Sequence, residues 1–174
     1  MTDDTLLPFS FPVACAEKIT AAFDDGRITS DGGIMLLAAA ERRLKLAGKL
    51  AAAIRDPRDP ARVRYSLTDI LRARVFAIAC GYEDANDLDR LRNDPAFKLA
   101  CGRLPDSGQD LCSQPTCSRL ENLPDLRTVI HLGRVLVDLW LSSYPAPKSV
   151  TLDPAPDAFI SAPLFTASRH HPAA

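Results

Sequence analysis

Residues 66–82, with the sequence SLTDILRARVFAIACGY, carry a strong helical pattern. Ser66 can cap such a helix at its N-terminus, and Asp69 three residues later is close to a capping-box arrangement. Gly81 suits the C-terminal end, where a glycine commonly terminates a helix. The apolar side chains that we expect on the buried side are Ile70, Leu71, Val75, Ile78 and Ala79. The stretch therefore predicts a core helix and indicates a mainly helical fold.

Helical patterns continue on both sides of this stretch. They cover residues 33–46, 49–54, 83–102, 113–122 and 125–144. The pattern over 83–102 divides into two shorter helices at Asp94–Pro95. The pattern over 125–144 has a broad apolar stripe at helical spacing, formed by Leu126, Val129, Ile130, Leu136, Val137 and Trp140.

Two segments have the composition of strands. Residues 19–29 predict an N-terminal β-hairpin that turns at Asp25–Gly26, because glycine accepts a positive φ without steric cost. Val150–Asp153 predicts one short C-terminal strand, and four prolines follow within the last 21 residues. The expected fold class is mainly α, with this hairpin and this strand added. The expected organisation is an extension over 1–18, the hairpin and helices over 19–145, the strand over 146–153 and an irregular tail over 154–174.

Composition and charge exclude several classes of protein. The 174 residues carry a net charge of −1, so any basic surface for nucleic acid must be local. Five cysteines and three histidines show no spacing typical of a metal site. The N-terminus has two acids where a signal peptide needs positive charge, and no apolar run approaches a membrane span. We therefore expect a cytoplasmic protein without a membrane partner.

The stretch SQPTCSRLEN, residues 113–122, is the first candidate functional element. Pro115 fits the first turn of a helix, and Cys117 and Leu120 can face inward. The outward side would then carry the hydrogen-bonding side chains of Gln114, Thr116, Ser118, Arg119 and Asn122. Such a set can bind base edges in a major groove, and the preceding short helix and turn suggest a helix-turn-helix element. The alternative is a polar surface helix in an ordinary bundle.

Two further candidates depend on charged residues. Arg58, Arg62 and Arg64 make the loop RDPRDPARVRYS basic, which fits either contacts with DNA phosphates or a solvated loop of Arg–Asp pairs. Asp153 ends the predicted C-terminal strand, where a carboxylate is well placed to hold a divalent cation. The alternative for Asp153 is a solvated strand end.

Four segments together resemble a known family. ITSDGGIMLLAAAERRL (28–44), DPRDPARVRYSLTDILRARVFAIACGYEDANDLDRLRNDPAFKLACGR (56–103), SQPTCSRLEN (113–122) and VTLD (150–153) occur in this order. They resemble the N-terminal portion of the IS1380-type insertion-sequence transposases, which belong to the DDE group. The resemblance covers about Ile19 to Asp153.

The resemblance implies DNA cutting and joining at the terminal inverted repeats of a transposon. In this family a ribonuclease-H-like domain holds acidic residues that bind Mg²⁺ for phosphoryl transfer. The first catalytic aspartate corresponds to Asp153, which would also be a metal ligand, and the reading helix corresponds to SQPTCSRLEN. The expected partners are transposon-end DNA and either a second copy of the chain or a full-length transposase.

The chain departs from the family pattern after Asp153. There the family continues into a further acid, whereas this sequence has Pro154, Ala155 and Pro156. We therefore expect a truncated or frameshifted transposase that is inactive alone and does not hold Mg²⁺ stably. The alternatives are a stand-alone DNA-binding regulator of a full-length transposase and an inert helical relic. The downstream nucleotide sequence tests the frameshift.

Overall fold

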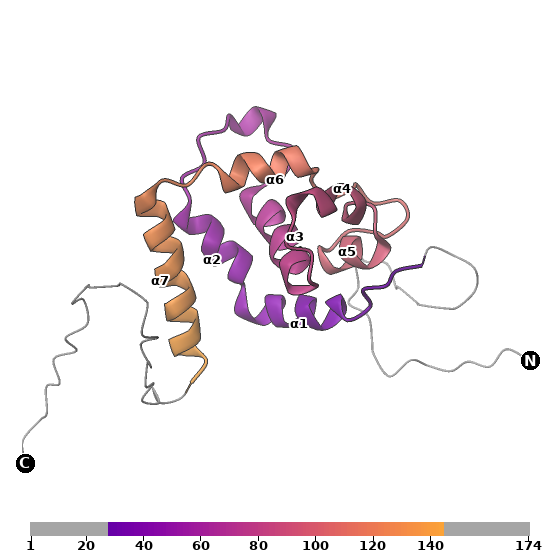
Figure 1. Cartoon of the computed structure of the whole chain (residues 1–174), viewed down its shortest axis with the longest axis horizontal. Helices are drawn as coiled ribbons and strands as arrows, with labels where there is room; N and C mark the ends of the chain where they lie inside the picture. Colours follow the sequence, from indigo (N-terminus) through magenta and orange to yellow (C-terminus); the bar gives the residue numbers. More distant parts are fainter. Residues whose placement is uncertain (1–27, 145–174) are drawn as a thin grey trace, which may run out of the picture. The chain divides into compact units, whose positions relative to one another are not determined.

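A computed structural model describes residues 28–144, and helices dominate this part of the chain (Figure 1). The chain divides into two units at residue 144, and all of these helices belong to the first unit. The α-helices are α1 (Ile34–Leu44), α2 (Leu46–Ala53), α3 (Leu67–Ala79), α4 (Leu88–Leu91), α5 (Pro95–Ala100), α6 (Gln114–Glu121) and α7 (Leu126–Ser142). Two single-turn 3₁₀ helices are η1 (Pro60–Arg62) and η2 (Ala85–Asp87).

The fold class predicted as mainly α with added β-structure is wrong for the described residues, which contain helices but no strand and no sheet. Ile28 and Thr29, at the end of the predicted hairpin, are irregular. The Thr29 hydroxyl accepts a hydrogen bond from the Asp31 amide and donates one to Asp94 Oδ1, both at 3.1 Å. These bonds make Thr29 part of the turn into α1. The remaining hairpin residues and the predicted strand over 150–153 lie outside the described residues.

Helix α3 lies in the middle of the first unit, with α1 and α6 on opposite sides of it (Figure 1). Its N-terminus is capped as the sequence predicts: Ser66 Oγ accepts from the Asp69 amide at 3.1 Å and donates to Asp69 Oδ2 at 2.8 Å. Gly81 follows the helix with φ of 91°. A positive φ is costly for other residues, so glycine suits this position.

The buried side of α3 differs from the prediction. Ile70 is buried as expected, but the other buried residues of the helix are Leu67, Ala73, Phe76 and Ala77. Ile78 is half exposed. Apolar residues occur all around this helix, so the pattern predicted its burial correctly but misplaced its inner face. The hydrophobic core then joins α3 to apolar side chains from the other helices, including Ile34, Leu88, Leu91, Phe97 and Leu111.

Helix α5 begins as the sequence predicts, directly after Asp94. The Asp94 side chain accepts hydrogen bonds from the amides of Ala96 and Phe97, at 2.9 and 3.0 Å. Such a cap satisfies N–H groups that have no partner within the helix. Since Asp94 also accepts the bond from Thr29, one carboxylate stabilises α5 and connects it to the segment that leads into α1.

Helix α7 packs against α2 but has no fully buried residue. Leu132 on its inner side contacts the core. We use the name α7 outer face for the large apolar side chains that remain exposed on this helix: Leu126, Val129, Ile130, Leu136, Val137, Trp140 and Leu141. Each of them keeps 44% or more of its surface exposed. Within residues 28–144, no helix has both the length and the hydrophobicity needed to cross a membrane.

Candidate nucleic-acid interface

Helix α6 turns the side predicted from the sequence toward the core. Cys117 and Leu120 are 0% and 7% exposed. Pro115 lies in the first turn, where its missing N–H leaves no helical hydrogen bond unmade. Burial of Cys117 and Leu120 fixes the rotation of α6 about its axis. Arg119 and Asn122 are then exposed, whereas Gln114, Thr116 and Ser118 are half-buried. The predicted inner side of this helix is therefore confirmed.

Local hydrogen bonds order part of the outward side of α6. Gln114 Nε2 donates to Ser118 Oγ at 3.0 Å, and Asn122 Nδ2 donates to the Ser118 carbonyl at 2.7 Å. The Thr116 and Ser113 hydroxyls lie 3.3 Å apart. Arg119 is exposed, and within residues 28–144 no hydrogen bond or ion pair holds its guanidinium group. Arg119 is therefore the member of the set that is most available to a ligand.

Both ends of α6 are fixed by residues that sequence reasoning did not single out. At its N-terminus the backbone amide of Gln114 donates to Asp89 Oδ1 at 3.0 Å. This bond places a negative charge at the positive end of the helix dipole. At its C-terminus Glu121 pairs with Arg74 of α3, with 2.6 Å between Oε1 and Nε. Arg74 also donates to the carbonyls of Tyr82 and Glu83. The side chain of Arg74 therefore joins α3, the turn that follows it and α6.

The connection before α6 differs from a helix-turn-helix motif. Such motifs join their two helices by a turn of about 3–4 residues. Here residues 101–113 separate α5 from α6, and α6 packs against α3 and η2. Gly108 allows the chain to fold back within this connection, since a Cβ at this position would lie 2.6 Å from the Leu104 amide nitrogen. The sequence therefore predicted the helix correctly but not the helix against which it packs.

We use the name arginine loop for residues 55–66. This loop has both features that the sequence left open, an Arg–Asp pair and arginines that are accessible to phosphates. Arg58 pairs with Asp56 through contacts of 2.7 and 2.8 Å and donates to the Tyr65 carbonyl at 3.1 Å. The side-chain hydrogen bond from Arg58 lowers the pKa of Asp56. Arg62 and Arg64 are exposed, and the Arg64 guanidinium lies 5.5 Å from the centroid of the Tyr65 ring. Arg58 thus stabilises the loop, whereas Arg62 and Arg64 remain accessible.

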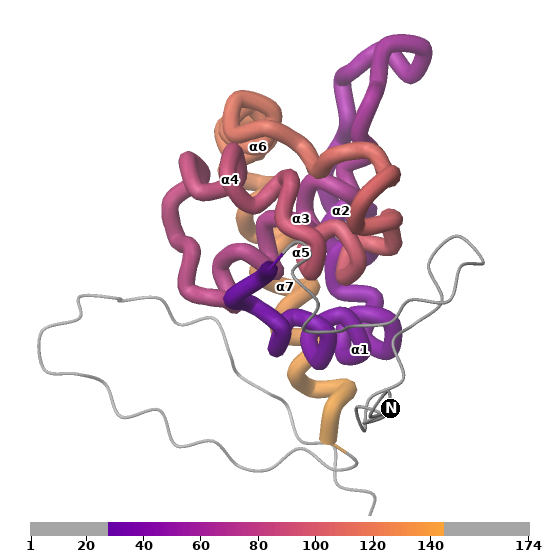
Figure 2. The backbone as a smooth tube through the Cα atoms, turned by 90° about the vertical axis from the view of Figure 1, so that its right-hand side faces the viewer, coloured from indigo at the N-terminus to yellow at the C-terminus, as the bar shows by residue number. Residues whose placement is uncertain are grey.

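The arginine loop and α6 occur at the same end of the described helices. Both lie at the top of Figure 1 and again at the top of Figure 2, which is turned by 90° about the vertical axis. Helix α1 lies below α3 in both views, on the side away from α6. The exposed arginines Arg62 and Arg64 therefore belong to a loop, and Arg119 to a helix, on this side of the first unit.

Neither Cys117 in α6 nor the half-buried Cys101 after α5 supplies a reactive thiolate. Burial raises the pKa of Cys117 to about 12 and that of Cys101 to about 12 as well. Since the thiolate is the reactive form, both side chains remain thiols at neutral pH. Cys117 thus contributes to α6 by packing.

The comparisons with known proteins identify the family. A family model described as transposase DDE domain group 1 matches residues 11–155. Because the matched residues make up most of the chain, the chain belongs to this family of DDE transposases. No curated protein and no solved structure matches the chain. Family membership implies DNA as the partner and a divalent metal ion, typically Mg²⁺.

The described residues do not fit the implied metal ion. Within 28–144 there is no group of three or more His, Cys, Asp or Glu side chains that could hold one. Asp153, to which the resemblance assigns the catalytic and metal-binding role, lies outside the described residues. The candidate site that the structure does describe is therefore the surface formed by α6 and the arginine loop, and its binding of DNA stays a prediction.

Proposed function

We propose that the chain is the DNA-engaging portion of an IS1380-type transposase and that α6 reads the terminal inverted repeats. The observation that carries this proposal is the orientation of α6. With Cys117 and Leu120 buried, Arg119 and Asn122 are exposed on a helix that is held at both ends. A rigid helix with exposed hydrogen-bonding side chains meets the requirements of direct readout in a major groove.

Each of the predicted side chains has a proposed part in this binding. Arg119 can donate two hydrogen bonds to a guanine, and the amide groups of Gln114 and Asn122 can bind an adenine. Thr116 and Ser118 are short donors and acceptors beside them. Arg62 and Arg64 contact phosphates from the neighbouring loop, since phosphate contacts position a protein on the duplex. Arg58 supports the loop through its pair with Asp56.

Binding measurements with two duplexes test the base-reading role. The labelled duplexes carry either the transposon end or the same bases in scrambled order, and the salt concentration is held constant. Arg119→Ala and the double variant with Gln114→Ala should each reduce the preference for end DNA, by about 1–3 kcal/mol for each base that the variant no longer binds. The matched control is Arg43→Ala, which removes an exposed arginine from α1 at the other end of the unit. Unchanged discrimination in the double variant would remove α6 from this role.

We further propose that the chain binds transposon ends without cutting them. The resemblance assigns a catalytic role to Asp153 alone, and two-metal phosphoryl transfer needs several convergent carboxylates. Purified chain should therefore leave supercoiled end-containing DNA intact in the presence of Mg²⁺. Nicking that disappears in Asp153→Asn would contradict this proposal. The expected truncation stays a prediction, which the nucleotide sequence downstream of codon 153 tests.

A further inference from the structure

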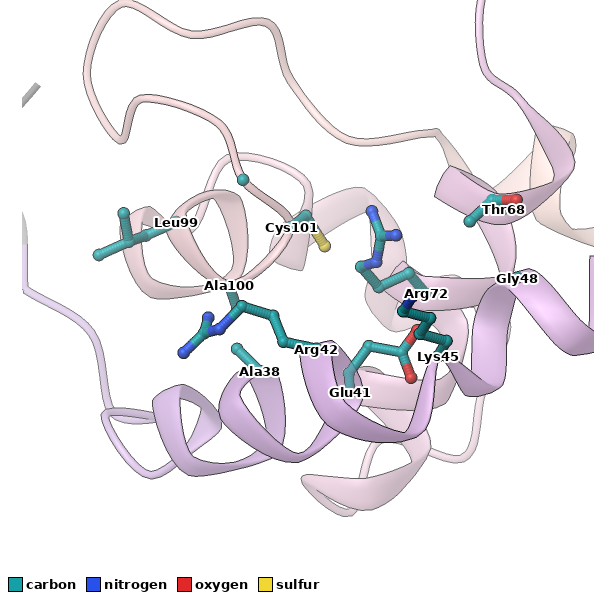
Figure 3. A pocket seen from close by; sticks show the side chains of 11 residues that line it. Ala38, Glu41, Arg42, Lys45, Gly48, Thr68, Arg72, Leu99, Ala100 and Cys101 are labelled. Atoms are coloured by element: carbon teal, nitrogen blue, oxygen red, sulfur yellow. The ribbon is translucent and has the colours of Figure 1, made fainter. Parts of the chain in front are cut away.

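A cavity of about 440 Å³ lies where α1, α2, α3 and the end of α5 meet. Its lining includes the basic side chains of Arg42, Lys45 and Arg72, together with the acidic Glu41. Figure 3 shows Glu41, Lys45 and Arg72 together on one side of the cavity, while Arg42 extends along α1 toward Ala100. The volume falls within the range of small-ligand sites, roughly 300–1,000 Å³.

The acid in the cavity does not neutralise the basic side chains by direct pairing. Both oxygens of Glu41 accept hydrogen bonds from the start of α2, Oε2 from the Leu46 amide and Oε1 from the Ala47 amide, each at 3.0 Å. Within the described part of the chain, Arg42 and Lys45 form no ion pair, and Arg72 forms one only with Asp69, at the long distance of 3.7 Å. The cations of this cavity therefore retain most of their capacity to bind an anion.

The backbone at Lys45 is an independent sign of a constrained site. Lys45 joins α1 to α2 with φ of 54° and ψ of 38°, and among residues 28–144 no other non-glycine residue has a positive φ. A side chain in this left-handed conformation costs free energy, and such residues gather at functional sites. The conformation is fixed on both sides, since the Lys45 amide bonds to the Glu41 carbonyl at 2.7 Å and the Lys49 amide bonds to the Lys45 carbonyl at 3.0 Å.

The remaining walls restrict which anion fits. Ala38 and Ala100 supply an apolar surface beside the Arg42 side chain, across the cavity from Lys45 and Arg72 (Figure 3). Cys101 also faces the cavity, and burial raises its pKa to about 12, so it adds no negative charge at neutral pH. A ligand with a small anionic head beside a less polar body matches both walls. Arginine and lysine together are typical phosphate ligands.

We infer that this cavity binds a phosphate group, carried either by a nucleic-acid backbone or by a free phosphate ester. The site is distinct from the surface around α6, because its lining contains no residue of α6 and because α1 and α6 lie on opposite sides of α3 (Figure 1). A phosphate site here would add a second place where the chain contacts DNA. Only the assignment to a nucleic-acid backbone rests on the proposed function.

Two arms of one experiment test the site and separate the two sources of phosphate. The proteins are the full chain, Arg42→Gln, Lys45→Gln, and the matched control Arg43→Gln, whose exposed arginine lies on the same helix outside the cavity. In the first arm, the melting temperature is compared in inorganic phosphate and in sodium chloride of equal ionic strength. In the second arm, the affinity for a duplex of unrelated sequence is measured as a function of salt.

In the phosphate arm, wild type and Arg43→Gln should melt several degrees higher in phosphate, since a ligand that binds only the folded state stabilises it. Arg42→Gln and Lys45→Gln should lose this difference. In the duplex arm, each of these two variants should reduce the slope of log K against log salt by about 0.9, the value for one phosphate contact.

A response in the phosphate arm alone assigns the site to free phosphate esters, and a response in the duplex arm identifies the nucleic-acid backbone as the source. If neither arm separates the two cavity variants from Arg43→Gln, the cavity is not a phosphate site. A phosphate response without any preference for transposon ends leaves this inference standing while the proposed function fails.

Discussion

Arg74 of α3 and Glu121 of α6 form an ion pair with 2.6 Å between Nε and Oε1. The Arg74 side chain is only 14% exposed, and its other nitrogens donate to the carbonyls of Tyr82 and Glu83. Residues 47 positions apart in the sequence are thereby joined at the point where the candidate reading helix ends. The orientation of α6 therefore depends on a residue that does not belong to the exposed surface of that helix.

Removing the guanidinium of Arg74 should destabilise the protein more than removing the charge of Glu121. Arg74→Met breaks three hydrogen bonds, so we expect the free energy of unfolding to fall by about 2 kcal/mol. Glu121→Gln keeps the two bonds to the carbonyls, and a partly exposed pair contributes roughly 0.2–1 kcal/mol. Urea denaturation followed by circular dichroism measures both values. Equal losses in the two variants would contradict a role for the carbonyl contacts.

Lys45→Gly should stabilise the protein although it removes a side chain. Glycine adopts the left-handed conformation of this junction without a Cβ clash, so we expect a gain of about 1 kcal/mol in the free energy of unfolding. Lys45→Ala is the matched control, since it removes the same charge but keeps the Cβ. Thermal unfolding compares the two. If both variants have the same stability, the backbone at residue 45 does not carry the expected cost.

The pair between Asp56 and Arg58 should make stability depend on pH in the acid range. The hydrogen bond from Arg58 holds the pKa of Asp56 below its usual value, so the contribution of this pair is complete above the unfolded-state pKa of about 3.9. It is lost as the pH falls through the lower pKa of the folded state. Asp56→Asn should therefore be less stable than wild type at pH 7, and this difference should shrink below about pH 4. Urea midpoints measured from pH 7 to pH 2 provide the comparison, and a constant difference across this range would contradict it.

Gly108→Ala should destabilise the connection that leads to α6. A methyl group there meets the backbone of Leu104, including its amide nitrogen at 2.6 Å, so the loop must shift. We expect a loss of about 1–3 kcal/mol, as in other overpacked positions. Gly133→Ala in α7 is the matched control, because a Cβ there meets nothing within 4 Å and alanine favours a helix by up to about 1 kcal/mol. Differential scanning calorimetry should show opposite shifts, and shifts of the same sign would contradict the packing described for Gly108.

Local sequence patterns predicted the parts of the structure that local interactions determine. The cap formed by Ser66 and Asp69 and the inner side of α6 at Cys117 and Leu120 are of this kind. Each of them depends on residues a few positions apart, where spacing alone decides which side chains meet. Membership of the DDE transposases also followed from motifs in the sequence.

Other features depend on contacts between distant segments and could not be predicted in this way. The ion pair of Arg74 with Glu121 and the bond from Gln114 to Asp89 join different helices. The inner face of α3 was misplaced because apolar residues surround that helix, so the packing of its neighbours decides which of them are buried. The strand-like composition of Ile28 and Thr29 was outweighed by the hydrogen bonds that Thr29 makes to Asp31 and Asp94.

The α7 outer face has a practical consequence for work with this chain. Seven large apolar side chains on one helix exceed what isolated exposed residues usually present to water, and patches of this kind promote aggregation. In concentrated samples, chains should therefore associate through the α7 outer face and precipitate. A mild non-ionic detergent should delay this precipitation. Replacing Leu136 and Val137 by glutamate should raise the solubility limit without touching the core, because both side chains are about half exposed.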